Sequence, residues 1–292
     1  MTTKPRRFLT PRDRDVLEAL DRTPLAAGQL LKLSRTFAHP FGSERMVRER
    51  LLALTTSGWV HAGKYATLGQ GSGQNYYRIS RVGYQILYGP HAQPPTKRYF
   101  SPLSLARQHH SRSLADFLVH TLAAVHAARA TVTDFYRENT LKLSVGDECL
   151  YPDAAFQLVL ADGRTFNYVV ELDNHTERIR SMKDADSWQR KIRLYDELQA
   201  VVPHRFRVLV VTTRSSPRLT AILALAATLT KNPQRSLFIG TSLPNYLEHV
   251  DALFAPAFLD HHRHGVPMVP ASAPRAATRQ IEDSAIQGTG VV

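Results

Sequence analysis

The sequence has little cysteine, no long apolar run and, in its first third, little negative charge. Cys149 is the single cysteine among 292 residues, so an internal disulfide is excluded and a reduced cytoplasm is the expected compartment. The opening residues, MTTKPRRFLTPRDRD, lack the apolar core of a secretion signal. The most apolar stretch, residues 221–229, is roughly half as long as a membrane-spanning helix requires. These absences predict a cytoplasmic protein with no membrane partner.

Positive charge is concentrated at the front of the chain. Residues 1–100 contain 16 Lys and Arg against 6 Asp and Glu, a net +10, whereas residues 101–292 contain 21 against 19, a net +2. Such a local surplus indicates affinity for a polyanion. No basic amphipathic pattern with a broad apolar face accompanies it, so nucleic acid is favoured over an anionic membrane surface.

The first part of the chain has the pattern of three helices followed by a hairpin. Thr10-Pro11 is typical of a helix start, and Ser43 has the features of a second helix cap. The other expected elements are a helix over residues 25–33, strands over 59–65 and 75–79, a hairpin tip at Gly69–Gly73, and a closing helix over 80–88. This order predicts a winged helix-turn-helix domain over residues 1–89.

Five basic side chains are the expected DNA contacts of this domain. They are Arg45, Arg48 and Arg50 near the start of the third helix, and Lys64 and Arg78 on the hairpin. Arginine reads guanine through two hydrogen bonds, and the start of a recognition helix meets base edges and phosphates. The alternatives are an ordinary solvated helix face and a winged helix that contacts protein. The local charge of +10 favours double-stranded DNA as the partner.

The rest of the chain predicts a second domain. Residues 90–102 contain four prolines and are expected to form a linker. The expected elements beyond it are helices over 103–130, 176–199 and 217–229, and strands over 132–143, 153–160, 164–173, 206–213 and 236–240. This order indicates an α/β (α+β) domain with a mixed sheet over residues 103–260. Residues 261–292 are rich in Ala, Pro, Ser and Gly, and a disordered tail is expected there.

Three carboxylates are expected at one edge of the mixed sheet. The turn at residues 161–163 predicts a tight hairpin, which places Asp153 beside Glu171. Glu171 and Asp173 share a face because side chains alternate along a strand. Carboxylate oxygens suit Mg²⁺ or Mn²⁺, and such an ion can activate water and stabilise a phosphodiester transition state. The alternative is structural: Asp153 caps a turn, and Glu171 pairs with an arginine such as Arg178.

The helix expected over residues 176–199 offers a cation for these carboxylates. Trp188, Lys191 and Tyr195 fall on one helical face. Because that face carries apolar bulk, it is expected to pack on the sheet. Lys191 is therefore expected to reach toward the carboxylates rather than toward solvent.

Short motifs in this region resemble those of the PD-(D/E)XK nuclease superfamily. Pro152-Asp153 matches the first motif, and Glu171-Leu172-Asp173 matches the second except that Asp173 replaces the usual lysine. Some branches supply that lysine from the next helix, which makes Lys191 the candidate. Lys191-x-x-x-Tyr195 is also similar to a Gln-x-x-x-Tyr motif, with Lys in place of Gln. The resemblance implies a nuclease-like fold, catalytic roles for these residues, and accessory roles for Glu138 and Tyr195.

Residues 9–215 as a whole resemble the replication-relaxation family of plasmid and mobile-element proteins. The similarity lies in Leu9-Thr10-Pro11-Arg12-Asp13, the Ser43 helix and wing, Tyr151-Pro152-Asp153-Ala154, Val170-Glu171-Leu172-Asp173 and Lys191-x-x-x-Tyr195. It implies a role in plasmid replication or DNA relaxation at an origin, with replication proteins as further partners.

Three functions are consistent with these patterns. The first is a metal-dependent endonuclease that nicks plasmid DNA. The second is a non-catalytic replication or transcription factor whose nuclease-like domain only binds DNA or a partner, and the third is a structural adaptor that recruits replication proteins. Covalent tyrosine chemistry is disfavoured, because the sequence lacks the His-hydrophobe-His strand pattern of familiar relaxases.

Overall fold

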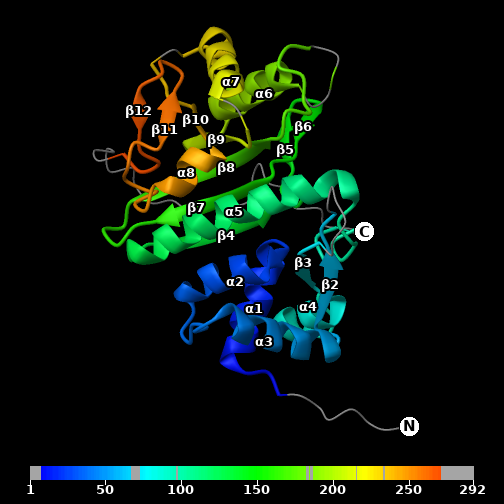
Figure 1. The fold of residues 1–292 in the computed structure, drawn as a ribbon. Coiled ribbons are helices and arrows are strands. Elements are labelled where there is room, and N and C mark those ends of the chain that lie inside the picture. Colours follow the sequence, from blue (N-terminus) through cyan, green and yellow to red (C-terminus); the bar gives the residue numbers. More distant parts are fainter. Residues whose placement is uncertain are drawn as a thin grey trace. The chain divides into compact units, whose positions relative to one another are not determined.

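The structure is a computed structural model that describes residues 8–66, 73–96, 98–181, 184, 187–214, 216–232 and 234–270. The chain divides into two compact units between Ala123 and Ala124. It is a mixed α and β protein with a large mixed sheet, as the sequence predicts (Figure 1). No helix among the described residues is long and apolar enough to cross a membrane.

The first unit contains helices around a small antiparallel sheet of order β1-β3-β2. Its elements are α1 (Pro11–Arg22), β1 (Leu25–Ala26), α2 (Ala27–Leu33), the 3₁₀ turn η1 (Ser34–Thr36), α3 (Glu44–Thr56), β2 (Val60–Lys64), β3 (Asn75–Ile79), α4 (Arg81–Tyr88) and most of α5 (Leu105–Ala127). The predicted hairpin is confirmed by the pairing of β2 with β3. Most of its predicted tip, Gly69–Ser72, lies outside the described residues.

Side-chain caps determine where α1 and α3 begin. The Thr10 hydroxyl accepts a hydrogen bond from the Asp13 amide at 3.2 Å, and the Asp13 carboxylate accepts one from the Thr10 amide at 3.1 Å. The Ser43 hydroxyl caps α3 by accepting from the Met46 amide. Both predicted starts are confirmed. The predicted helix over 25–33 begins later, at Ala27, because Leu25 and Ala26 pair with β3.

Residues 90–102 pack against the first unit, whereas the sequence predicts a linker there. The rings of Tyr99 and Phe100 lie 5.4 and 5.7 Å from that of Tyr84. The Tyr99 hydroxyl donates to the Asp21 carboxylate at 2.6 Å. Further on, the Gln108 side chain accepts from the Ala66 amide at 2.6 Å. The prolines are present, but Tyr99 is buried and Phe100 is half-buried beside Tyr84, and the division of the chain falls later, within α5.

The second unit is organised around a seven-stranded mixed sheet of order β12-β11-β10-β9-β8-β7-β4. Its elements after α5 are β4 (Thr131–Arg137), β5 (Leu143–Val145), β6 (Glu148–Leu150), β7 (Ala154–Val159), β8 (Thr165–Asp173), α6 (Trp188–Val201), β9 (Phe206–Thr212), α7 (Ser216–Leu229), β10 (Phe238–Ser242), α8 (Leu243–Glu248), β11 (Phe258–Asp260) and β12 (Gly265–Val266). The strands β8, β9 and β10 are parallel, and antiparallel pairs flank them on both sides.

The hairpin between β7 and β8 turns at Asp162-Gly163, as predicted. Gly163 has φ +82°, a conformation that favours glycine, and its amide donates to the Leu160 carbonyl at 2.9 Å. The register pairs Ala154 with Val170. At the outer strand, β4 carries a bulge between Thr133 and Tyr136, where Asp134 has φ +46°.

Helices α6 and α7 pack together on one face of this sheet (Figure 1). The core beneath them includes Trp188, Tyr195 and Ile222, which are fully buried against the valines of β9. Glu171 and Asp173 point to this same face, because their contacts are with α6 and α7. The predicted face of Trp188, Lys191 and Tyr195 therefore does pack on the sheet.

Two predicted boundaries of the second unit are wrong. Helix α6 begins at Trp188 rather than at Thr176, because Ser187 caps it and the chain at His175 takes a left-handed φ of +66°. Residues 261–270 are ordered rather than a disordered tail: β12 pairs with β11, and Met268 and Val269 are buried. The Val269 amide donates to the Leu253 carbonyl at 2.9 Å. The remainder of the predicted tail, 271–292, lies outside the described residues.

Candidate functional site

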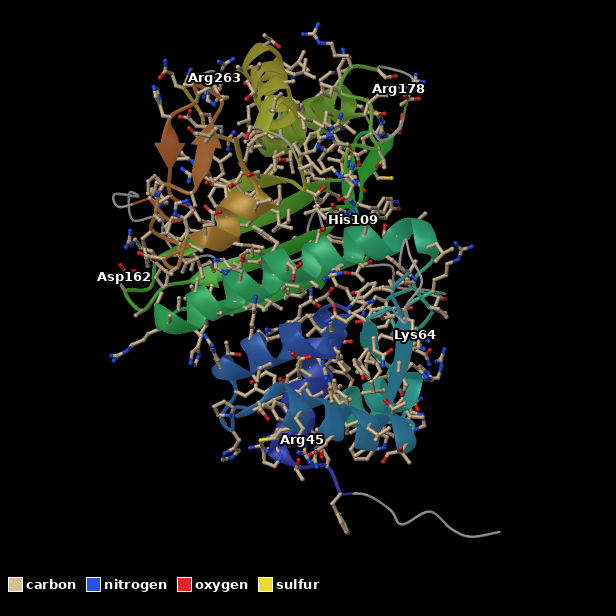
Figure 2. The ribbon with its side chains drawn as sticks, viewed as in Figure 1. Arg45, Lys64, His109, Asp162, Arg178 and Arg263 are labelled. Carbon is tan, nitrogen blue, oxygen red and sulfur yellow. The ribbon has the colours of Figure 1, made fainter. Side chains whose placement is uncertain are left out.

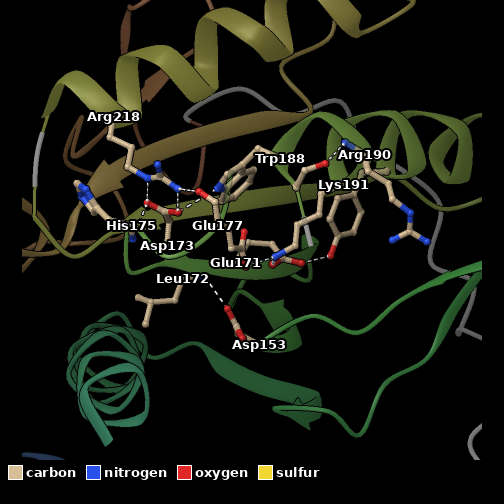
Figure 3. A network of polar contacts seen from close by, with 12 residues as sticks. Asp153, Glu171, Leu172, Asp173, His175, Glu177, Trp188, Arg190, Lys191 and Arg218 are labelled. Atoms are coloured by element: carbon tan, nitrogen blue, oxygen red, sulfur yellow. Dashed lines mark hydrogen bonds and ion pairs between the residues drawn. The ribbon is translucent and has the colours of Figure 1, made fainter. Parts of the chain in front are cut away.

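The candidate site is built on the final residues of β8 and on the residue that precedes β7. The Asp153 amide donates to the Val170 carbonyl at 3.1 Å, and the Leu172 amide donates to the Asp153 carboxylate at 2.7 Å (Figure 3). Two backbone contacts thus hold Asp153 against the strand that carries Glu171. The predicted proximity of these two residues follows from the β7–β8 register.

Glu171 is the centre of the polar network. Its side chain is only 3% exposed. One carboxylate oxygen accepts from the Lys191 ammonium at 2.8 Å, and the other accepts from the Tyr195 hydroxyl at 2.5 Å. Lys191 therefore reaches the carboxylates, as the helical spacing predicts. The alternative pairing of Glu171 with Arg178 is wrong, because Arg178 pairs with Asp184 at 3.4 Å.

Glu177 is a member of this site that the sequence did not reveal. Its carboxylate accepts from the Lys191 ammonium at 2.7 Å, so that lysine bridges Glu171 and Glu177 (Figure 3). Glu177 was assigned to a helix over 176–199, but it lies in the irregular segment before α6. A polar run directly after a buried strand, Asn174-His175-Thr176-Glu177, is the sequence signal that could have indicated it.

Asp173 has a different environment from the one predicted. It is fully buried, and its two oxygens accept from the Arg218 guanidinium at 2.5 and 2.7 Å. The Trp188 indole donates to it as well, at 3.1 Å. Both oxygens are therefore engaged by cationic or N–H donors. The two carboxylates of this face therefore differ in their neighbours: Asp153 lies near Glu171, whereas Asp173 forms a twofold ion pair with Arg218, and we leave Asp173 out of the metal-binding set.

Burial and charge together shift the protonation of the network. Burial raises the pKa of Glu177 to about 7, although Lys191 acts in the opposite direction. Burial alone would lower the pKa of Lys191, but Glu171, Glu177 and Asp153 outweigh it, and the pKa is raised. Lys191 is therefore a permanent cation. Burial and Glu171 raise the pKa of Tyr195, so its hydroxyl stays protonated and donates.

The donor set fits a hard divalent cation. A carboxylate oxygen of Glu138 lies within 4.8 Å of one of Asp153, so the predicted accessory residue does lie beside the site. Glu177 contributes one oxygen that is buried and makes no hydrogen bond with a described residue. Glu171, Glu177 and Asp153 lie near the single ammonium of Lys191, and the excess of carboxylates is of the kind that Mg²⁺ or Mn²⁺ neutralises.

In the first unit, the five predicted DNA contacts fall into two groups, and Figure 2 labels two members of the exposed group, Arg45 and Lys64. Arg45, Arg48 and Lys64 are exposed, and the first two form helical pairs with Glu49 and Glu44 at 2.8 and 2.5 Å. Arg50 instead pairs with the buried Asp13 at 2.6 Å, and Arg78 donates to the Phe100 carbonyl. The exposed group can meet a polyanion, whereas Arg50 and Arg78 hold the unit together.

Comparison with protein-family models gives no match, and comparisons with curated proteins and with solved structures give none either. The resemblance to the replication-relaxation family therefore stays a prediction, and the function is argued from the site itself.

Proposed function

We propose that this chain is a DNA-binding protein that nicks DNA with the help of Mg²⁺ or Mn²⁺. The observation that carries the proposal is the bridge of the Lys191 ammonium between Glu171 and Glu177, beside Asp153. A buried cation among carboxylates at the end of a sheet strand is the arrangement that the PD-(D/E)XK resemblance implies. The first unit serves as the winged helix-turn-helix domain, and plasmid or mobile-element DNA is the proposed substrate.

Asp153, Glu138 and Glu171 are the residues that would hold the metal ion. When bound, the ion supplies positive charge to the phosphodiester and makes water a better nucleophile. Lys191 orients the attacking water and stabilises negative charge that develops on the phosphate, because its raised pKa keeps it protonated. Glu177 is suited to accept the proton of that water, since its pKa lies at about 7. Tyr195 fixes the orientation of Glu171.

One observation favours a second function. Both oxygens of Glu171 are already hydrogen-bonded to protein groups, and Asp173 is held by Arg218. A site satisfied in this way also suits a non-catalytic replication or transcription factor, in which the nuclease-like unit binds DNA or replication proteins. The two functions differ in whether the site cleaves a DNA strand or only binds DNA or a partner.

Conversion of supercoiled plasmid to the open-circular form separates these functions. Wild type is expected to nick in Mg²⁺ or Mn²⁺ and to stop when a chelator is added. Glu171→Gln and Lys191→Met are expected to lower the rate by at least about 100-fold, since a positioned charge or proton acceptor contributes on that order. The matched control is Asp162→Asn, which changes an exposed carboxylate in the β7–β8 turn.

The results decide between the two functions. Equal and undetectable nicking by wild type and Glu171→Gln in both metals would favour the non-catalytic factor. A nick that persists in chelator, with protein attached to the DNA, would indicate covalent tyrosine chemistry instead.

DNA binding by the first unit is tested separately. The double variant Arg45→Ala, Arg48→Ala is expected to weaken duplex binding and to make the dependence of log affinity on log salt shallower by up to about 2 units, one for each lost phosphate contact. Arg214→Ala, an exposed arginine after β9, removes a charge from the other unit as a control. An unchanged salt slope in the double variant would remove these arginines from the interface.

A further inference from the structure

A surface cavity of about 310 Å³ in the second unit is lined by Arg205, Asn232, Gln234 and Arg235. Arg205 directly precedes β9, and Arg235 lies shortly before β10. These strands are parallel neighbours, with Phe238 opposite Val208, so their amino ends meet at one edge of the sheet. The topology thus brings together two arginines that are thirty residues apart in the sequence.

Backbone hydrogen bonds hold both arginines in place. The Arg205 carbonyl accepts from the Asn167 side chain at 3.0 Å. The Arg235 amide donates to the Asn232 carbonyl at 3.1 Å, and its carbonyl accepts from the Leu237 amide at 2.9 Å. Because none of these bonds involves a guanidinium, both charged groups remain available to a ligand. The backbone atoms that carry the two guanidinium groups are therefore fixed, while the side chains stay accessible.

The side chains that line the cavity carry two positive charges and no negative charge. Within the part of the chain that the structure describes, neither Arg205 nor Arg235 forms an ion pair. Burial and then the nearby Arg205 lower the pKa of Arg235, while Asp196 acts weakly in the opposite direction. All four lining side chains carry N–H donors. Two mutually repelling guanidinium groups with amide donors beside them match the oxygens of a phosphate.

We propose that this cavity binds a phosphate group through Arg205 and Arg235, with Asn232 and Gln234 as further donors. The site is distinct from the carboxylate network. The network lies at the carboxyl end of β8, whereas Arg205 is held by Asn167, which lies near the start of that strand. The phosphate is either a terminal one, as on a nucleotide, or an internal phosphodiester of a DNA strand. The assignment does not depend on nuclease activity.

The full chain is titrated at low ionic strength with inorganic phosphate and, separately, with a short DNA strand that lacks terminal phosphates. The readout is the NMR signals of the arginine Nε–H groups, with sodium chloride of equal ionic strength as the salt control. Phosphate is expected to shift the Arg235 signal in a saturable way. Arg205→Gln and Arg235→Gln are each expected to weaken this binding by at least tenfold. Arg214→Gln, which removes the same charge beyond the other end of β9, is expected to leave it unchanged.

The melting temperature of each variant, measured without phosphate, shows whether a loss of binding comes from misfolding. Removing one of two like charges is expected to leave the melting temperature of Arg235→Gln equal to or above that of wild type. Saturation by inorganic phosphate alone assigns a terminal phosphate as the ligand, and saturation by the DNA strand assigns an internal phosphodiester. The absence of saturable shifts with both probes, or equal shifts in wild type and Arg235→Gln, would overturn the proposal.

Discussion

Glu171 and Asp173 lie two residues apart on one face of β8, yet their surroundings differ. Glu171 belongs to the proposed active site, whereas Asp173 has a structural role. Glu171 is held by an ammonium and a phenol, beside Asp153. Asp173 forms a paired, twofold contact with a guanidinium that is itself only 15% exposed. An aspartate in that position neutralises Arg218 and thereby anchors α7 to the end of the sheet.

The substitution Asp173→Asn is expected to destabilise the protein by about 3 to 5 kcal/mol, because it removes the only carboxylate that the structure pairs with Arg218 among the described residues. Urea unfolding monitored by circular dichroism measures this loss. It is expected to be the same with and without Mg²⁺. A loss that appears only in the presence of Mg²⁺ would instead return Asp173 to the metal-binding set.

Glu177 is expected to make the folding stability of the protein decrease as the pH rises. Its pKa is raised from 4.5 to about 7 in the folded state, so the folded protein holds a proton that the unfolded chain releases between these values. Stability from this group is fully present below pH 4.5 and falls as the pH rises through 7, by at most about 3 kcal/mol. Glu177→Gln, which remains neutral, is expected to flatten that fall.

Melting temperatures of wild type and Glu177→Gln between pH 4.5 and 8 provide the measurement. Asp162→Asn again serves as the exposed control. Parallel curves for wild type and Glu177→Gln would show that the pKa of Glu177 is the same in the folded and unfolded states, and the argument for its role from a pKa of about 7 would fail.

At the scale of elements, the start of α1 and the middle of α3 are joined by one side chain. The Arg50 guanidinium contacts both Asp13 oxygens at 2.6 Å and the Thr10 hydroxyl at 2.8 Å. Asp13 is fully buried and is also part of the α1 cap. The cap of one helix thus depends on a residue of another.

Arg50→Ala is therefore expected to destabilise the first unit by about 3 kcal/mol, since it removes both guanidinium contacts of the buried Asp13 carboxylate. Arg45→Ala and Arg48→Ala are expected to change stability by less than about 0.5 kcal/mol, because exposed helical pairs contribute little. Thermal unfolding of the three variants tests this contrast. Equal stability of Arg50→Ala and Arg45→Ala would mean that Arg50 is as available to DNA as its neighbours.

The elements that sequence patterns predicted well are those with local determinants. Thr10 and Ser43 cap their helices through contacts three residues away, and Gly163 adopts the turn that its own backbone permits. The pairing of Lys191 with Glu171 also followed, because helical and strand periodicity fix which faces meet. Glu177 did not follow, since its position depends on an irregular segment with no periodicity.

The failures share a physical cause: contacts between residues distant in sequence override local composition. Residues 90–102 have the composition of a linker, but the buried Tyr99 and the half-buried Phe100 pack their rings against Tyr84. Residues 261–270 are a second example. Met268 and Val269 are buried, and the Met268 carbonyl accepts from the Tyr168 hydroxyl, one hundred residues earlier in the chain. Arg50 has the sequence features of a DNA contact, but its guanidinium pairs with Asp13, which lies thirty-seven residues away in the sequence.

At the scale of the whole molecule, the division between Ala123 and Ala124 makes a prediction about fragments. A fragment of residues 1–123 retains Tyr99 and Gln108, whereas a fragment of residues 1–89 loses the contacts of Tyr99 with Tyr84 and Asp21 and that of Gln108 with Ala66. The longer fragment is expected to melt at a clearly higher temperature, by several degrees for each ~1 kcal/mol of lost contacts. Melting curves for the two fragments test this. Equal melting temperatures would restore residue 89 as the domain boundary.

The two outer strands of the large sheet bear on whether copies of this chain adhere to one another. Outer strands present unpaired backbone groups that another chain can extend into a growing sheet. Among the described strands, β12 is only two residues long, and β4 is distorted by its bulge, with Asp134 exposed where a flat strand would be needed. Strand β12 is too short to act as a template for another strand. Strand β4 is bent at its bulge and carries a charged side chain there. Neither outer strand therefore offers a long, flat edge to which a strand of a neighbouring molecule could pair during synthesis or refolding.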